Sequence, residues 1–150
     1  MTRNLLKISM LLILILLISA GCSKDSTEPD HTHADAEGLT LTLNGVEVVR
    51  IEEGAITGGI SVAAGTETAL ISLQFLDHDG DEFVPDDEDY SLGYSFANGD
   101  IAEWEQHSED GKYRFHVVGK AAGSTTLTLE LLHGDHADYQ SPPIPITVTQ

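Results

Sequence analysis

The strongest constraint on the fold is a two-residue hydrophobic period that recurs from about residue 39 to the C-terminus. In the clearest stretch, Ile71, Leu73 and Phe75 alternate with Ser72 and Gln74. The same alternation returns in residues 90–96, 112–117 and 126–131. Because successive side chains of a β-strand point to opposite faces, each stretch is typical of a half-buried strand. No window beyond residue 38 keeps a helical period, so the sequence predicts an all-β domain.

Turn signals divide this region into short strands. Asn44-Gly45 separates two apolar runs and favours a tight hairpin. Pro145 cannot donate a backbone hydrogen bond, which favours an edge position for the last strand. The length suits one domain, and eight or nine short strands indicate a β-sandwich. The predicted strands are residues 39–43, 46–49, 60–63, 68–76, 90–96, 101–106, 112–119, 124–132 and 144–149.

Three segments also carry a family resemblance. Residues 61–70 (SVAAGTETAL), 98–104 (NGDIAEW) and 119–129 (GKAAGSTTLTL) resemble the landmarks of the bacterial immunoglobulin-like domain, group two. The resemblance covers roughly residues 59–150 and implies an immunoglobulin-like β-sandwich, with residues 39–56 as an addition. That family includes adhesins, enzyme accessory modules and surface proteins, so the fold alone does not assign a function.

The N-terminus has the pattern of a secretory signal peptide. Arg3 and Lys7 precede an uninterrupted apolar run, residues 8–18. The run is too short for a spanning helix, which needs about 20 apolar residues. We therefore expect residues 1–21 to be removed from the mature protein.

The end of this segment, Ile18-Ser19-Ala20-Gly21-Cys22, resembles the lipobox of bacterial lipoproteins. It departs from the family at Ser19, where Leu is usual. The resemblance implies that Cys22 is lipidated and anchors the chain to a membrane of the bacterial cell envelope, with a periplasmic or extracellular domain. Ser23 after the cysteine favours the outer membrane in a Gram-negative envelope. The alternative is an ordinary signal peptide followed by a chance cysteine.

Residues 22–38 are polar and acidic, without a large apolar residue, and are predicted to form a flexible tether between the lipidated cysteine and a sandwich of residues 39–150. His31 and His33 lie on this tether. With one cysteine in the chain, no internal disulfide can form.

The charge of the chain is strongly negative. Seven Lys and Arg stand against 25 Asp and Glu, for a net charge of −18. Loss of residues 1–21 removes two basic and no acidic residues, which gives −20. Nucleic-acid backbones are held by clustered Lys and Arg, so a nucleic-acid partner is excluded. Eight of the acids fall within residues 77–89, where they would attract a cation.

The histidines fall mostly in predicted loops. The second to seventh core strands of the expected immunoglobulin-like sandwich are assigned, in order, to residues 68–76, 90–96, 101–106, 112–119, 124–132 and 144–149. In such a sandwich the loops after the second, fourth and sixth strands emerge at one end. Those loops are residues 77–89, 107–111 and 133–143, and they carry His78, His107, His133 and His136. His116 lies in mid-strand, opposite the predicted core face.

The segment His133-Gly134-Asp135-His136-Ala137-Asp138 is the sharpest candidate metal site. Two imidazoles three residues apart can point at one ion, with Asp135 or Asp138 as a ligand or an acceptor behind the ligands. A histidine and carboxylate set without thiolates suits Zn²⁺, ahead of Cu²⁺, Ni²⁺ and Mn²⁺. His78 with Asp79, and the tether pair His31 and His33, could complete the shell. The alternative is a set of solvated loop histidines.

The segment Asp77-His78-Asp79-Gly80-Asp81-Glu82 suggests Ca²⁺ as a less favoured ligand, because alternate carboxylates suit a hard cation. It departs from the EF-hand loop, since Gly80 is fourth rather than sixth and no flanking helices are predicted. The alternative is a solvated acidic loop.

No nucleophile elbow, catalytic cysteine or phosphate-binding glycine loop is present, so we expect no enzyme activity. Two function classes remain. One is a lipid-anchored protein that binds a metal outside the cytoplasm and passes it to an envelope transporter or receptor. The other is a surface adhesion or protein-interaction module that binds no metal.

Overall fold

The computed structural model describes residues 34–150, and every regular element in that range is a β-strand. This confirms the predicted all-β class. The strands are β1 (Gly38–Leu43), β2 (Val46–Glu52), β3 (Ala55–Gly58), β4 (Ile60–Ala63), β5 (Ile71–Leu76), β6 (Glu82–Phe83), β7 (Tyr90–Phe96), β8 (Ala102–Glu105), β9 (Arg114–Gly119), β10 (Gly123–His133), β11 (His136–Gln140) and β12 (Ile144–Thr149).

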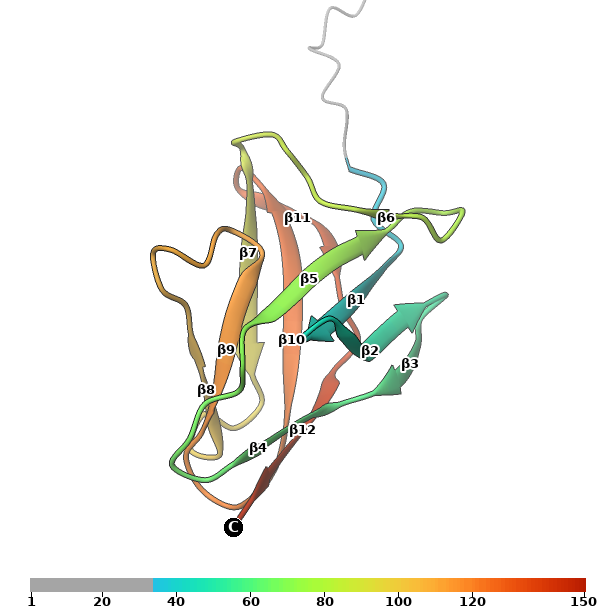
Figure 1. Cartoon of the computed structure of the whole chain (residues 1–150). Helices are drawn as coiled ribbons and strands as arrows, with labels where there is room; N and C mark the ends of the chain where they lie inside the picture. The colour runs from blue at the N-terminus through green and yellow to red at the C-terminus, as the bar shows by residue number, and fades with distance from the viewer. Residues whose placement is uncertain (1–33) are drawn as a thin grey trace, which may run out of the picture. The chain divides into compact units, whose positions relative to one another are not determined.

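The strands form two facing sheets (Figure 1). The first sheet has the order β3-β2-β1-β5-β9-β8, and β6 pairs with the end of β5. The second has the order β11-β10-β12-β4, with β7 on the other side of β10. All pairs of strands are antiparallel except β4 with β12, which run parallel.

The distribution of strands is that of an immunoglobulin-like sandwich. The second, fourth and fifth predicted core strands are β5, β8 and β9, and they share the first sheet. The third, sixth and seventh are β7, β10 and β12, and they share the second sheet. Constant-type immunoglobulin domains divide their strands in this way. The β1–β2 hairpin and β3 extend the first sheet beyond β5.

The core lies between the sheets and uses the predicted alternation. Phe75 of β5 and Phe115 of β9 are fully buried from one side. Leu127, Leu129 and Leu131 of β10 are fully buried from the other. At about 25 cal/mol per Å² of apolar surface removed from water, these side chains dominate the stability of the fold. Among the described residues, the core cluster draws on both sheets and on Ala34 and Ala36, which pack against it.

The expected edge position of the last strand is wrong. β12 lies between β10 and β4, so it is paired on both sides. Pro145 pairs with Thr126 of β10, whereas the pairing with β4 begins only at Ile146. The missing N–H of Pro145 therefore falls just beyond the end of β4, where no ladder hydrogen bond needs it.

Three short strands were not predicted: β3, β6 and β11. Glu53 and Gly54 both have positive φ and make the tight turn between β2 and β3. β11 occupies a segment that was expected to be a loop, residues 133–143, with consequences for the candidate site.

The predicted tether, residues 22–38, is shorter than expected, because the chain already contacts the folded body from Ala34 onwards. Gly38 begins β1, the backbone N–H of Glu37 donates to the carbonyl of Leu76, and Ala34 and Ala36 pack against the core. Small alanine side chains allow this close approach despite the acidic composition. The predicted signal segment, Cys22, His31 and His33 lie outside the described residues. Within the described range no helix has the length and apolarity needed to cross a membrane.

Candidate metal centre

The β10–β11 hairpin positions the candidate metal ligands. His133 and His136 are register partners on either side of the turn Gly134-Asp135. Gly134 has φ +60, as expected for the first central residue of a type II′ turn. Because paired residues of antiparallel strands project to the same face, the two imidazoles lie together, with ring centroids 5.5 Å apart. The sequence pair is therefore a cross-strand pair rather than two loop residues.

A β-bulge brings the third side chain to this pair. Leu131 pairs with Tyr139 and Leu132 pairs with Ala137, which leaves Asp138 as the extra residue of β11. Bulges re-aim side chains and are frequent beside functional sites. The Asp138 carboxylate reaches both imidazoles: Oδ1 lies 3.0 Å from His136 Nε2, and Oδ2 lies 3.6 Å from His133 Nδ1.

His133, His136 and Asp138 form the hairpin site. Each offers one ligand atom such that all three atoms lie within 4.8 Å of one another. The side chain of Asp138 is only 6% exposed and that of His133 is 12% exposed, whereas His136 is half exposed. The site is thus an open patch with a buried carboxylate beneath it.

The surroundings hold His133 in place. Its ring stacks on Tyr90 of β7, with centroids 4.5 Å apart and planes at 19°. Burial, together with the charge of the nearby Asp138, raises the pKa of Tyr90, so its phenol stays neutral at physiological pH. The Tyr90 hydroxyl accepts a hydrogen bond from the backbone N–H of Ala34 at 2.6 Å. Ala34, the first described residue, therefore lies next to Tyr90, whose ring packs on His133.

The three loops expected at one end do contact one another. The N–H of Gly134 donates to the carbonyl of Asp89, which ends the loop before β7. Lys112 Nζ, in the loop between β8 and β9, donates to the carbonyls of Asp87 and Glu88. The histidines of these loops nevertheless belong to separate groups.

His78 and Asp79 are not brought to the hairpin site. They form an exposed pair at 3.2 Å in the turn between β5 and β6, and they line a 210 Å³ hollow with Glu52 and Glu53. No group of metal-ligand side chains within residues 34–150 includes either of them. Asp135 is fully exposed on the hairpin turn, 3.6 Å from His136 Nδ1, and it too is outside the three-residue group.

The acidic turn between β5 and β6 is organised by its own backbone. Asp77 Oδ1 accepts hydrogen bonds from the N–H groups of Asp79 and Asp81, both at 2.9 Å. A carboxylate used in this way stabilises the turn. Among the described residues no group of potential metal ligands contains an acid from residues 77–82, the segment that suggested Ca²⁺.

A second group was missed by sequence reasoning. His107, Asp110 and His116 also place their ligand atoms within 4.8 Å of one another. His116 was expected to stand apart in mid-strand. The pairing of β8 with β9, which sets His116 opposite Glu105, is what brings it to the loop histidine. The only sequence signal was the outward position of His116 on its strand.

No protein-family model matches the chain, and no curated protein matches it. Three solved structures of one surface-layer protein are similar in fold. Domains 4 and 5 of the S-layer protein SbsC share 20% identity, with a TM-score of 0.46 over 79% of this chain and 55% of that chain. Domains 5–6 share 23%, with a TM-score of 0.44 over 62% of this chain and 40% of theirs. Domains 1–6 share 18%, with a TM-score of 0.42 over 79% of this chain and 21% of theirs. The chain thus spans about half or less of each.

Proposed function

We propose that this chain is a lipid-anchored domain of the bacterial cell envelope that binds a divalent transition metal, Zn²⁺ before others, at the hairpin site. The observation that carries the proposal is the convergence of His133, His136 and Asp138 within 4.8 Å. Two imidazoles and a carboxylate, with one position left open, are a donor set typical of zinc.

The spacing of the donors suits one ion. Two ligands bound at about 2.1 Å to a tetrahedral ion lie about 3.4 Å apart. The carboxylate-to-imidazole distances at the hairpin site are 3.0 and 3.6 Å. These distances start from different oxygens of Asp138, so in this proposal side-chain rotations bring one donor atom of each residue to the same ion.

The fourth ligand in this proposal comes from the tether. His33 is bonded to Ala34, whose N–H contacts Tyr90, and His31 is two residues further back. Ala34 and Asp35 line a 380 Å³ hollow together with Asp138.

Anchoring through Cys22 would hold the site at a membrane surface. A metal bound in an open patch, with one ligand supplied by the tether, can be exchanged with a partner. We propose an envelope metal transporter or receptor as that partner.

Zinc titration by calorimetry tests this function. The sample is the chain from Ser23 to Gln150, which keeps the whole described body. We expect one equivalent, bound more tightly than millimolar, to be lost in the His133→Ala/His136→Ala variant. His78→Ala is the matched control, because His78 is exposed and outside the group, and it should bind as the parent does. Parent-like binding by the double variant would refute the hairpin site.

The second candidate function is a surface adhesion or protein-interaction module that binds no metal. The exposed acidic loop favours it, since seven of the eight acids in residues 77–89 are exposed. Such a surface suits a basic partner. Binding of a basic peptide that weakens with salt but is unaffected by a chelator would support this function, and loss of that binding with the chelator would support the metal.

A further inference from the structure

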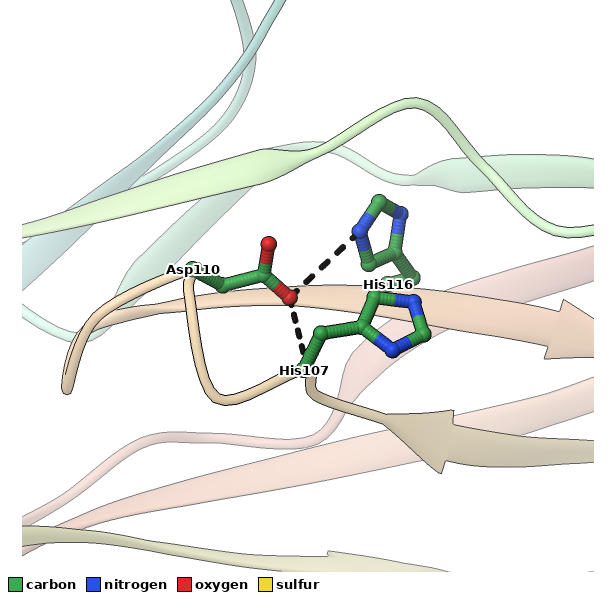
Figure 2. A group of neighbouring side chains, drawn as sticks. All are labelled: His107, Asp110 and His116. Atoms are coloured by element: carbon green, nitrogen blue, oxygen red, sulfur yellow. Dashed lines mark hydrogen bonds and ion pairs between the residues drawn. The ribbon is translucent and has the colours of Figure 1, made fainter.

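A second histidine cluster lies where β8 and β9 meet their connecting loop. His107 follows β8, Asp110 is in the loop, and His116 is on β9. Figure 2 shows one oxygen of the Asp110 carboxylate between the His116 ring and the backbone of His107. We call His107, Asp110 and His116 the β8–β9 site. It shares no residue with the hairpin site.

The loop that carries Asp110 is held firmly. Asp110 Oδ2 accepts a hydrogen bond from the backbone N–H of His107 at 2.7 Å, and the N–H of Asp110 donates to the carbonyl of His107. Gln106 Nε2 donates to the carbonyls of Gly111 and Arg114 at 2.9 and 2.8 Å. These bonds fix the carboxylate before any ligand arrives.

His116 is oriented as a metal-binding histidine would be. Its Nδ1 lies 2.9 Å from the carbonyl oxygen of Thr68. A carbonyl can only accept a hydrogen bond, so Nδ1 carries a proton and Nε2 is the nitrogen left to bind a metal. Thr68 is itself fixed, since its N–H donates to the carbonyl of Val117 and its hydroxyl accepts from the N–H of Val117. A carbonyl behind the imidazole, which sets the tautomer and the ring orientation, is the usual support of a metal ligand.

Nε2 of His116 faces a carboxylate. Nε2 lies 3.6 Å from Asp110 Oδ2, and the side chains are 12% and 9% exposed. At this distance the two atoms are too far apart for a good direct hydrogen bond. The separation is close to the roughly 3.4 Å between two ligands of a tetrahedral zinc ion. A metal ion between Nε2 and Oδ2 would therefore be within bonding distance of both atoms.

His107 supplies the third donor. Its ring centroid is 5.3 Å from that of His116, and its side chain is 42% exposed. Its Nε2 lies 3.9 Å from Glu105 Oε1, and Glu105 also groups with Glu67 and His107. Glu105 and Glu67 therefore lie on the solvent side of the site, where either could be a fourth ligand or accept a hydrogen bond from the His107 ring.

The geometry points to a second divalent transition-metal site, formed by His107, Asp110 and His116, which takes Zn²⁺ independently of the hairpin site. A bound ion would link β9 to the β8–β9 loop. The domain then holds two ions. This inference goes beyond the proposed function and stands without it, because its ligands and its elements are different.

Zinc titration of the chain from Ser23 to Gln150 tests the second site. The variant is His107→Ala/Asp110→Asn, in which the new amide oxygen can still accept from the N–H of residue 107. The parent should bind two equivalents. The variant should lose one, or bind it at least about tenfold more weakly, and His133→Ala/His136→Ala should lose the other. Far-UV circular dichroism of each variant checks that it is folded.

The outcomes separate the two proposals. If the only equivalent disappears in His133→Ala/His136→Ala and persists in His107→Ala/Asp110→Asn, the second site is refuted and the proposed function stands. The reverse pattern refutes the hairpin site and supports the β8–β9 site.

Imidazole nitrogen NMR of the unmodified chain gives a readout that needs no variant. Before zinc, His116 should show a protonated Nδ1, and on zinc addition its Nε2 signal should shift. A His116 Nε2 signal that does not change at saturating zinc would overturn the inference.

Discussion

At the scale of single residues, two buried phenols stand out. The hydroxyls of Tyr113 and Tyr139 are shielded from solvent and have no hydrogen-bond partner within residues 34–150. Both rings meet Phe75 edge-on, with centroids 6.0 Å apart. These tyrosines therefore act mainly as aromatic core residues, and each hydroxyl carries a desolvation cost that no hydrogen bond within residues 34–150 offsets.

Burial of these hydroxyls should lower the free energy of unfolding at alkaline pH. Burial raises the pKa of Tyr139 to about 12, from about 10 in the unfolded chain. Since the folded state holds the proton more tightly, its contribution to the free energy of unfolding is complete below about pH 10 and is lost as the pH rises towards 12. Tyr139→Phe should be at least as stable as the parent at about pH 8, and its relative stability should increase above pH 10.

Urea unfolding at several pH values measures this difference. Tyr113→Phe is the companion variant, because burial raises the pKa of Tyr113 to about 12 as well. A Tyr139→Phe variant that is less stable by more than about 1 kcal/mol at pH 8 would mean that the hydroxyl makes a hydrogen bond.

Residue chemistry also explains what the sequence could predict of the sites. The proximity of His133, His136 and Asp138 follows from their short separation along the chain. The β8–β9 site depends on a strand register and on the Thr68 carbonyl, 48 residues from His116. No local pattern encodes such a contact. The same reason explains why His78 and Asp79 lie at the same end of the sandwich as the hairpin site but do not join it.

At the scale of elements, the two-residue period predicted the main strands well. β7 and β12 have the predicted bounds, and β5, β8, β9 and β10 differ by up to three residues at an end. β11 was missed because its segment is short and begins with polar residues, which have low strand propensity. It forms because β10 extends far enough to offer it a partner.

The hairpin turn should be essential to the proposed site. Gly134 has φ +60, and a Cβ added there would meet no atom within 4 Å. Gly134→Ala therefore adds backbone strain without a clash, and should lower the free energy of unfolding by about 1 kcal/mol. It should also weaken zinc binding, because the turn sets the spacing of His133 and His136.

Urea unfolding and zinc titration measure both effects. Gly99→Ala is the matched control, since Gly99 is not among the residues with positive φ and an added Cβ there also meets nothing within 4 Å. Equal stability and equal zinc affinity of the two variants would show that the turn does not organise the site.

At the scale of the whole molecule, the immunoglobulin-like sandwich carries the two proposed metal sites, which share no residue, on an acidic body. The net charge of −18 attracts cations in general, but the described carboxylates that join histidines in the two sites are nearly buried. Position along the folded strands, rather than total charge, selects which acids can act as ligands. The composition predicts that the protein attracts cations, but it cannot predict which acids are placed to act as ligands.

The tether histidines should contribute to zinc binding at the hairpin site. Deletion of residues 23–32 removes His31 but keeps His33 and the contact of Ala34 with Tyr90. We expect zinc affinity at the hairpin site to fall, with the β8–β9 site unaffected. His31→Ala/His33→Ala in the full tether is the matched variant and should weaken binding further. An unchanged isotherm for both would exclude the tether from the metal shell.

The most direct test of the central claim is anomalous diffraction at the zinc absorption edge, from crystals of the chain from Ser23 to Gln150 grown with Zn²⁺. We expect a peak about 2.0–2.2 Å from a nitrogen of His133, a nitrogen of His136 and an oxygen of Asp138. A map with no zinc peak beside His133 and His136, in crystals that contain zinc, would contradict it.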